Sequence, residues 1–125
     1  MKKVIATDNA PVAIGPYSQA IEVNGMIFIS GQLPVDPTTG KFPSGGIKEQ
    51  TEQSFKNIKA ILAEAGLTTD NIVKTTVLLA DIAYFSGMNE VYEAQFSGIF
   101  PARSAFAVKD LPKGAMVEIE VIAAR

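Results

Sequence analysis

Apolar and polar residues repeat along the chain with two different periods, which predict strands and helices. Two segments, at residues 47–65 and 84–96, carry apolar side chains at the 3.6-residue spacing of an amphipathic helix. Short stretches rich in β-branched and aromatic residues predict six strands, at residues 2–6, 20–23, 26–30, 73–80, 103–108 and 116–123. The predicted order is strand, two strands, helix, strand, helix, two strands.

Glycine and proline mark the boundaries between these elements. The pair Asn24-Gly25 separates the second and third strands and is typical of a type I′ hairpin turn, in which both central residues need a positive φ. Residues 31–46 contain three prolines and four glycines, so we expect a loop there. Gly66 follows the first helix and predicts its end.

The element order predicts one α+β domain over residues 1–125. We expect a six-stranded mixed sheet with two helices on one of its faces. The second face would then need another cover, and a symmetric oligomer supplies one most simply. An apolar fraction of 47%, high for a soluble domain, agrees with some apolar surface being covered by a partner subunit.

Composition narrows the chemistry, because the chain has no cysteine and no histidine. Thiolate nucleophiles, cysteine-based metal sites and the commonest general base are therefore excluded. Two carboxylates without histidine make a poor transition-metal site, so we expect no metal. A net charge of −2 lacks the basic footprint of a nucleic-acid binder, so we expect no nucleic-acid partner.

Hydropathy predicts the compartment. Uninterrupted apolar runs are only a few residues long, too short to cross a bilayer. The first residues lack the longer apolar region and small-residue cleavage site of a secretory signal. We therefore expect a cytoplasmic protein without a membrane partner.

Arg103 is one of only two arginines, and it lies in an otherwise apolar strand. Strand alternation places Arg103 on the same face as Ala105 and Ala107, whose small side chains leave room for an anion. A guanidinium binds a carboxylate through two parallel hydrogen bonds, which fixes its orientation. The alternative is a structural arginine paired with a glutamate or a backbone carbonyl, and the strand pattern taken alone favours it.

Glu118 and Glu120 share one face of the last strand. Two such carboxylates are candidates for acid–base catalysis, with one group acting and the other setting its charge environment. The pattern alone favours a solvated edge strand instead. Lys109 and Lys113 are near in sequence and could neutralise the pair.

Two further segments hold candidate binding groups. Tyr17 follows Gly15-Pro16, so its hydroxyl could donate a hydrogen bond from a fixed position, although simple ring packing is commoner. Ser30-Gly31 ends the third strand, where glycine would let a ligand approach the backbone N–H closely. The alternative for Gly31 is an ordinary turn glycine.

Four separated motifs together resemble the reactive-intermediate deaminase (RidA) family, also called the YjgF/YER057c/UK114 family. They are residues 10–20 (APVAIGPYSQA), 29–32 (ISGQ), 101–104 (PARS) and 118–120 (EIE). The resemblance covers essentially the whole chain. It implies a chorismate-mutase-like (YjgF-like) fold, a homotrimer with active sites between subunits, and no cofactor.

The resemblance also implies an activity and a set of site residues. The activity is hydrolysis of 2-iminobutanoate and 2-iminopropanoate, released by amino-acid dehydratases, to 2-oxo acids and ammonia. Many active members carry a cysteine at the position of Ala105. The implied catalytic residues are Arg103 and Glu118, and the implied substrate-binding residues are Arg103, Tyr17, Ser30, Gly31, Asn89 and Ala105.

Two rival functions remain open at the level of sequence. A non-catalytic module that binds or senses 2-oxo acids would use Arg103 and would not need Glu118. An endoribonuclease or translation inhibitor is disfavoured by the acidic net charge, the absence of histidine and the scarcity of arginine.

Overall fold

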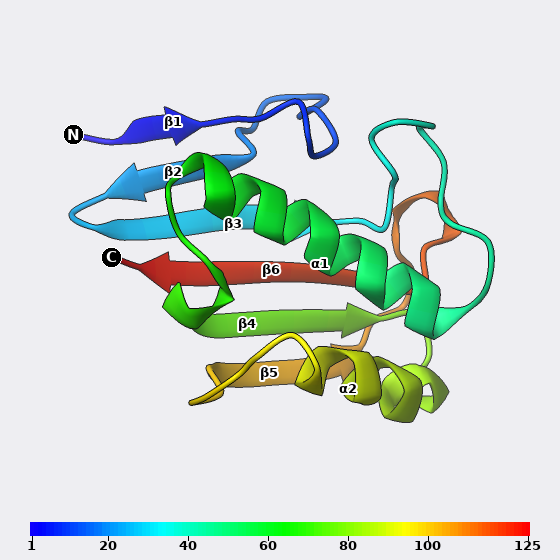
Figure 1. Cartoon of the computed structure of the whole chain (residues 1–125). Helices are drawn as coiled ribbons and strands as arrows, with labels where there is room; N and C mark the ends of the chain where they lie inside the picture. Colours follow the sequence, from blue (N-terminus) through cyan, green and yellow to red (C-terminus); the bar gives the residue numbers. More distant parts are fainter.

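The computed structural model describes all residues 1–125 and contains the predicted six strands and two helices in the predicted order (Figure 1). The fold class is therefore confirmed. The elements are β1 (Lys3–Ile5), β2 (Ala20–Val23), β3 (Met26–Gln32), α1 (Ile47–Glu64), β4 (Ile72–Leu79), α2 (Phe85–Glu93), β5 (Ala102–Ala107) and β6 (Val117–Ala124).

The strands form one mixed sheet in the order β1-β2-β3-β6-β4-β5. Only β4 and β5 run parallel, and the crossover between them contains α2. The last strand, β6, inserts between β3 and β4 and pairs antiparallel with both. The expectation of a solvated edge strand for Glu118 and Glu120 is therefore wrong, because β6 lies in the interior of the sheet.

The turns follow the predicted chemistry, and only β3 and α2 have a boundary that differs from the prediction by more than one residue. Asn24 and Gly25 both have positive φ, 51° and 77°, as a type I′ turn requires. Strand β3 continues past Ser30 to Gln32, because Gln32 pairs with Ile119 beyond an irregularity in the ladder. The second helix is shorter than predicted: it begins at Phe85, after a 3₁₀ turn at Ile82–Tyr84, and ends at Glu93.

Both helices cover the same face of the sheet (Figure 1). The apolar stripe of α1 packs on the inward-facing residues of β3, β4 and β6, which form one core. Phe55, Ile58, Ile61 and Leu62 of this stripe are fully buried. The ring of Phe55 lies edge-on to that of Tyr92 on α2, with centroids 5.7 Å apart, so the two helices share an aromatic contact.

Helix α1 also buries polar residues that the hydrophobic pattern did not identify. Ser54 donates from its hydroxyl to the carbonyl of Gln32 at 3.0 Å. Asn57 donates from its amide to the carbonyls of Leu33 and Val35, at 3.1 and 2.9 Å. These bonds fasten the end of β3 and the loop after it to the helix.

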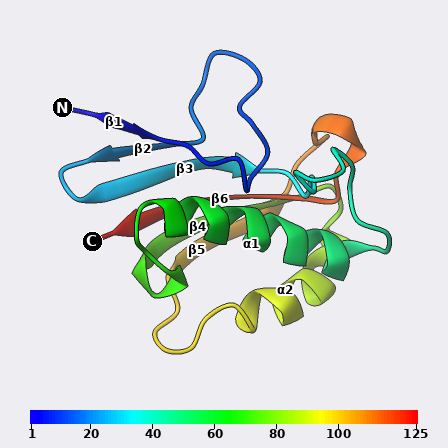
Figure 2. The ribbon, with the colours of Figure 1, turned by 45° about the horizontal axis from the view of Figure 1, so that its top comes forward.

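The other face of the sheet carries no helix, and we call it the open face. It includes Phe28 of β3 and Phe106 of β5, whose side chains are 44% and 47% exposed. The segment between β1 and β2 first passes the end of α1, where Ala10 is buried in the core, and then rises away from both helices (Figure 2). Neither helix is long and apolar enough to cross a membrane.

Candidate active site

Arg103 lies on the helix-covered side of β5, at the position in register with Thr75 of β4. Helix α2 runs beside it and offers three side chains from one stripe. The Nη1 of Arg103 donates to Oδ1 of Asn89 at 2.7 Å. The guanidinium carbon lies 4.7 Å from the ring centroid of Tyr92 and 5.4 Å from that of Phe85. The cation is thus held by an amide oxygen and two aromatic faces.

No carboxylate neutralises Arg103. The molecule has two ion pairs, Lys48 with Glu90 and Arg125 with Glu22, and neither involves this side chain. Its one hydrogen bond goes to a side-chain amide, not to a backbone carbonyl. Within this chain, Arg103 therefore forms neither the glutamate pair nor the carbonyl bond that the structural alternative assumed. A hollow of about 370 Å³ adjoins the guanidinium and is lined by Asn89, Tyr92, Glu93, Phe100, Pro101 and Arg103.

Glu118 lies on the open face, where it is half-buried next to Gly31 of β3. A Cβ atom added to Gly31 would overlap the Glu118 carboxylate, so glycine is what permits this approach. Burial raises the pKa of Glu118, and the negative charge of Glu120 adds to the effect. Neither Lys109 nor Lys113 forms an ion pair with it, so the expected neutralisation by these lysines is not found.

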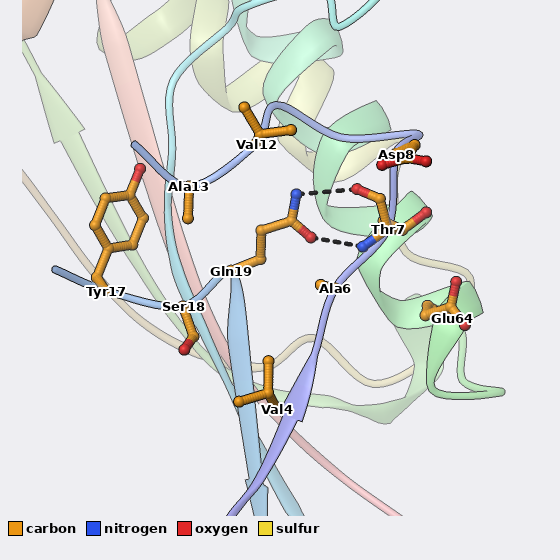
Figure 3. Close-up of a pocket in the computed structure, with 10 residues that line it drawn as sticks. All are labelled: Val4, Ala6, Thr7, Asp8, Val12, Ala13, Tyr17, Ser18, Gln19 and Glu64. Carbon is orange, nitrogen blue, oxygen red and sulfur yellow. Dashed lines mark hydrogen bonds between the residues drawn. The ribbon is translucent and has the colours of Figure 1, made fainter. Parts of the chain in front are cut away.

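Ser30 joins this group to the segment that carries Tyr17. Its hydroxyl donates to the carbonyl of Ser18 at 2.6 Å. The next residue, Gln19, is buried, and its amide both donates to and accepts from the backbone of Thr7, at 3.0 and 2.8 Å. Figure 3 shows these bonds and places Tyr17 at the wall of a hollow of about 430 Å³.

The predicted site residues thus form two groups on opposite sides of the sheet. The Arg103 group also holds Asn89 on α2 and Ala105 on β5. The Glu118 group holds Gly31, Ser30 and, through Ser18, Tyr17. Strand β4 separates β5 from β6, and Glu118 pairs in register with Leu78, whose side chain lies on the open face. One chain therefore does not bring the two groups together.

Comparison with known proteins identifies the family of the chain. A family model described as endoribonuclease L-PSP matches residues 7–125. The chain belongs to the endoribonuclease L-PSP family. The resemblance drawn from the four motifs is confirmed, because relatives in this family include deaminases and Rid proteins.

Members of the endoribonuclease L-PSP family are similar to the chain over nearly its whole length. The mouse 2-iminobutanoate/2-iminopropanoate deaminase is 51% identical across 98% of this chain and 91% of its own. A Rid-family structure from Yersinia pestis is 54% identical, with a TM-score of 0.97 over 100% of both chains. TdcF from E. coli, solved with bound serine, is 44% identical, with a TM-score of 0.94 over 98% of both chains.

The sequence did not identify three residues that lie around Arg103 in this member of the L-PSP family. Phe85 and Tyr92 lie at helical spacing, and the pattern assigned them to the core rather than to the arginine. Thr75 lies in a buried strand and gave no signal. A spacing of i, i+4 and i+7 for Phe85, Asn89 and Tyr92 could have indicated one common helix face. Acidic side chains do not gather into any group of three or more that could hold a metal ion.

Proposed function

We propose that the protein hydrolyses 2-imino acids to 2-oxo acids and ammonia, with 2-iminobutanoate and 2-iminopropanoate as substrates. The deaminases of mouse and human support this activity, since each is 51% identical to the chain over 98% of its length. We expect the reaction to take place in the cytoplasm. One observation in the structure carries the proposal: Arg103 is a cation without a carboxylate partner, next to a hollow.

Arg103 binds the substrate carboxylate in this proposal. Asn89 takes one N–H of the guanidinium, which leaves the others for two parallel bonds to a carboxylate. The guanidinium forms no ion pair within the chain, so its charge is available to the anion. Binding through two bonds also orients the imine carbon, so the arginine serves positioning as well as affinity.

Glu118 acts as the base. Its carboxylate takes a proton from the water that attacks the imine carbon, while the C=N electron pair moves to nitrogen and nitrogen takes up a proton. A second proton passes from the new hydroxyl to nitrogen, the C–N bond breaks and ammonia leaves. A raised pKa suits a carboxyl group that must both accept and return a proton.

A second copy of the chain completes the site in this proposal. Arg103 of one subunit and Glu118 of a neighbour face a common cleft, since within one chain the sheet separates them. We propose a homotrimer, in which each open face is covered and three such clefts form. The exposed side chains of Phe28 and Phe106 support an oligomer that covers this face.

The test is a coupled assay in which a threonine dehydratase generates 2-iminobutanoate. Release of 2-oxobutanoate is followed with and without the protein, while semicarbazide competes for the imine. We expect the protein to accelerate release, and Arg103→Ala to lose at least about a hundredfold of that acceleration. Arg125→Ala is the matched control, since the only other arginine pairs with Glu22 and should be dispensable.

Glu118→Gln separates the deaminase from a 2-oxo acid sensor. A sensor would bind 2-oxobutanoate through Arg103 without accelerating hydrolysis in any variant. A deaminase retains ligand affinity in Glu118→Gln and loses turnover. If the folded wild-type protein binds 2-oxobutanoate but leaves imine hydrolysis at its spontaneous rate, the deaminase proposal fails.

A further inference from the structure

Tyr92 is the residue that most directly supports the guanidinium of Arg103. Its ring centroid lies 4.7 Å from the guanidinium carbon, nearer than that of Phe85 at 5.4 Å. An arginine on an edge strand can adopt many rotamers, and ordering them costs conformational entropy. A fixed aromatic face beneath the cation reduces this cost before the substrate binds.

Tyr92 is itself held rigidly. Its side chain is 4% exposed, and its hydroxyl forms a 2.8 Å hydrogen bond with the Thr75 hydroxyl inside the core. Phe55 packs edge-on against the same ring, at an interplanar angle of 75°. Thr75 is also the register partner of Arg103 in the sheet. The hydroxyl of Tyr92 is thus anchored to the strand adjacent to the one that carries the arginine.

We propose that Tyr92 is a positioning residue, which holds the Arg103 guanidinium in the orientation that receives a carboxylate. This role rests on the proposed function, in which Arg103 binds the substrate. Asn89 fixes one edge of the guanidinium and Tyr92 fixes its plane. Thr75 and Phe55 act one step further out, by keeping the Tyr92 ring in place.

Kinetics of Tyr92 variants test the proposal. Tyr92→Leu removes the ring, and we expect KM to rise about tenfold while kcat changes less than about twofold, because pre-orientation affects binding. Tyr92→Phe keeps the ring and should largely restore KM, to within about threefold of the wild-type value. The control is Tyr84→Leu, the same substitution at a tyrosine just before α2 whose ring stacks on neither Arg103 nor Tyr92, and its KM should stay unchanged.

A spectroscopic readout makes the test independent of activity. With arginine alone isotopically labelled, the chain gives only two guanidinium signals, and Arg125→Lys assigns them. The Tyr92 ring face should shift the Arg103 side-chain protons upfield. We expect this shift to fall in Tyr92→Leu to the smaller contribution of Phe85, and to persist in both Tyr92→Phe and Tyr84→Leu.

The results distinguish failure of this inference from failure of the proposed function. If Tyr92→Leu is folded and keeps both the upfield shift and the wild-type KM, Tyr92 does not position the arginine. Binding of the substrate carboxylate by Arg103 would still stand, provided Arg103→Ala is inactive. If Tyr92→Leu does not fold, a Tyr92→Phe protein without the upfield shift overturns the inference. An active Arg103→Ala protein overturns the proposed carboxylate binding by Arg103 instead, whatever the spectra of the Tyr92 variants show.

Discussion

Gly31 and Glu118 approach one another so closely that no side chain fits between them. The φ of Gly31 is not in the left-handed region, so the close approach explains this glycine and backbone freedom does not. The colliding atoms belong to the flexible end of Glu118. An added methyl group would therefore displace the carboxylate rather than the backbone.

Gly31→Ala is expected to reduce kcat/KM for 2-iminobutanoate about tenfold or more, because the base no longer points at the attacking water. The free energy of unfolding should fall by less than about 1 kcal/mol, since a side chain can move aside. The coupled assay and urea denaturation measure the two effects. Gly98→Ala is the control, because a Cβ there meets nothing within 4 Å. Full activity in Gly31→Ala would show that the exact place of Glu118 is unimportant.

Glu118 also sets an expected pH dependence. Its pKa lies above the ordinary value of 4.5, through burial first and repulsion by Glu120 second. A base must be ionised, so kcat/KM should fall as the pH is lowered through this raised pKa. Glu120→Gln removes the repulsion and should move the acidic limb of the profile to lower pH. An unchanged limb in that variant would contradict the assignment of the limb to Glu118.

The same pKa predicts the sign of an effect on stability. A carboxyl group with a raised pKa in the folded state stabilises the fold fully below its unfolded pKa, near 4.5. That contribution is lost as the pH rises through the folded pKa. Glu118→Gln should therefore gain stability relative to wild type, in urea denaturation, as the pH rises from below 4.5 through the raised pKa. A difference that is constant with pH would count against the raised pKa.

At the scale of the elements, α1 does more than cover the sheet. Its buried polar residues bind carbonyl groups at the end of β3 and in the following loop, through Ser54 and Asn57. Gly31 and Ser30 lie immediately before this fastened stretch. The helix therefore helps to hold the strand that carries half of the candidate site.

Asn57→Leu should lower the free energy of unfolding by about 3 kcal/mol, because two carbonyls lose their donor inside the protein. Urea denaturation followed by circular dichroism, at one protein concentration, measures this loss. Lys59→Leu makes the same kind of change on the exposed side of α1 and should cost less than about 0.5 kcal/mol. Equal effects of the two substitutions would mean that the buried amide bonds contribute little.

At the scale of the whole molecule, the separation of Arg103 from Glu118 within one chain predicts that activity depends on the proposed homotrimer. The two residues lie on strands β5 and β6, with β4 between them, and their side chains point to opposite sides. In the proposed site, one subunit supplies Arg103 and its neighbour supplies Glu118. This requirement can be tested without any structural measurement.

Arg103→Ala and Glu118→Gln subunits should complement one another. Each variant alone should be inactive. After unfolding and refolding of a 1:1 mixture, about a quarter of wild-type activity should appear, because random assembly joins an intact arginine to an intact glutamate at that frequency. Mixing without refolding is the control, and analytical ultracentrifugation checks the assembly state. A refolded mixture without activity would place both residues in one subunit's site.

The sequence determined the elements, because hydrophobic periodicity and turn residues act over a few neighbouring positions. The hairpin at Asn24-Gly25 and the strand alternation around Arg103 and Glu118 all follow from such local rules. The hydrophobic pattern did not give every boundary, because it extended the second helix to Phe96 and α2 ends at Glu93. Four short motifs also sufficed for the family, which the family model confirms.

Only the tertiary structure decided how these elements combine into a candidate site. The insertion of β6 between β3 and β4 is a long-range pairing, and it put Glu118 inside the sheet next to Gly31. The position of α2 likewise decides the surroundings of Arg103. It places Tyr92 and Asn89 against the guanidinium, which has no carboxylate partner. Alternation along a strand assigns side chains to two faces. Which face becomes the core, and what lies opposite each charge, is settled only when distant segments pack together.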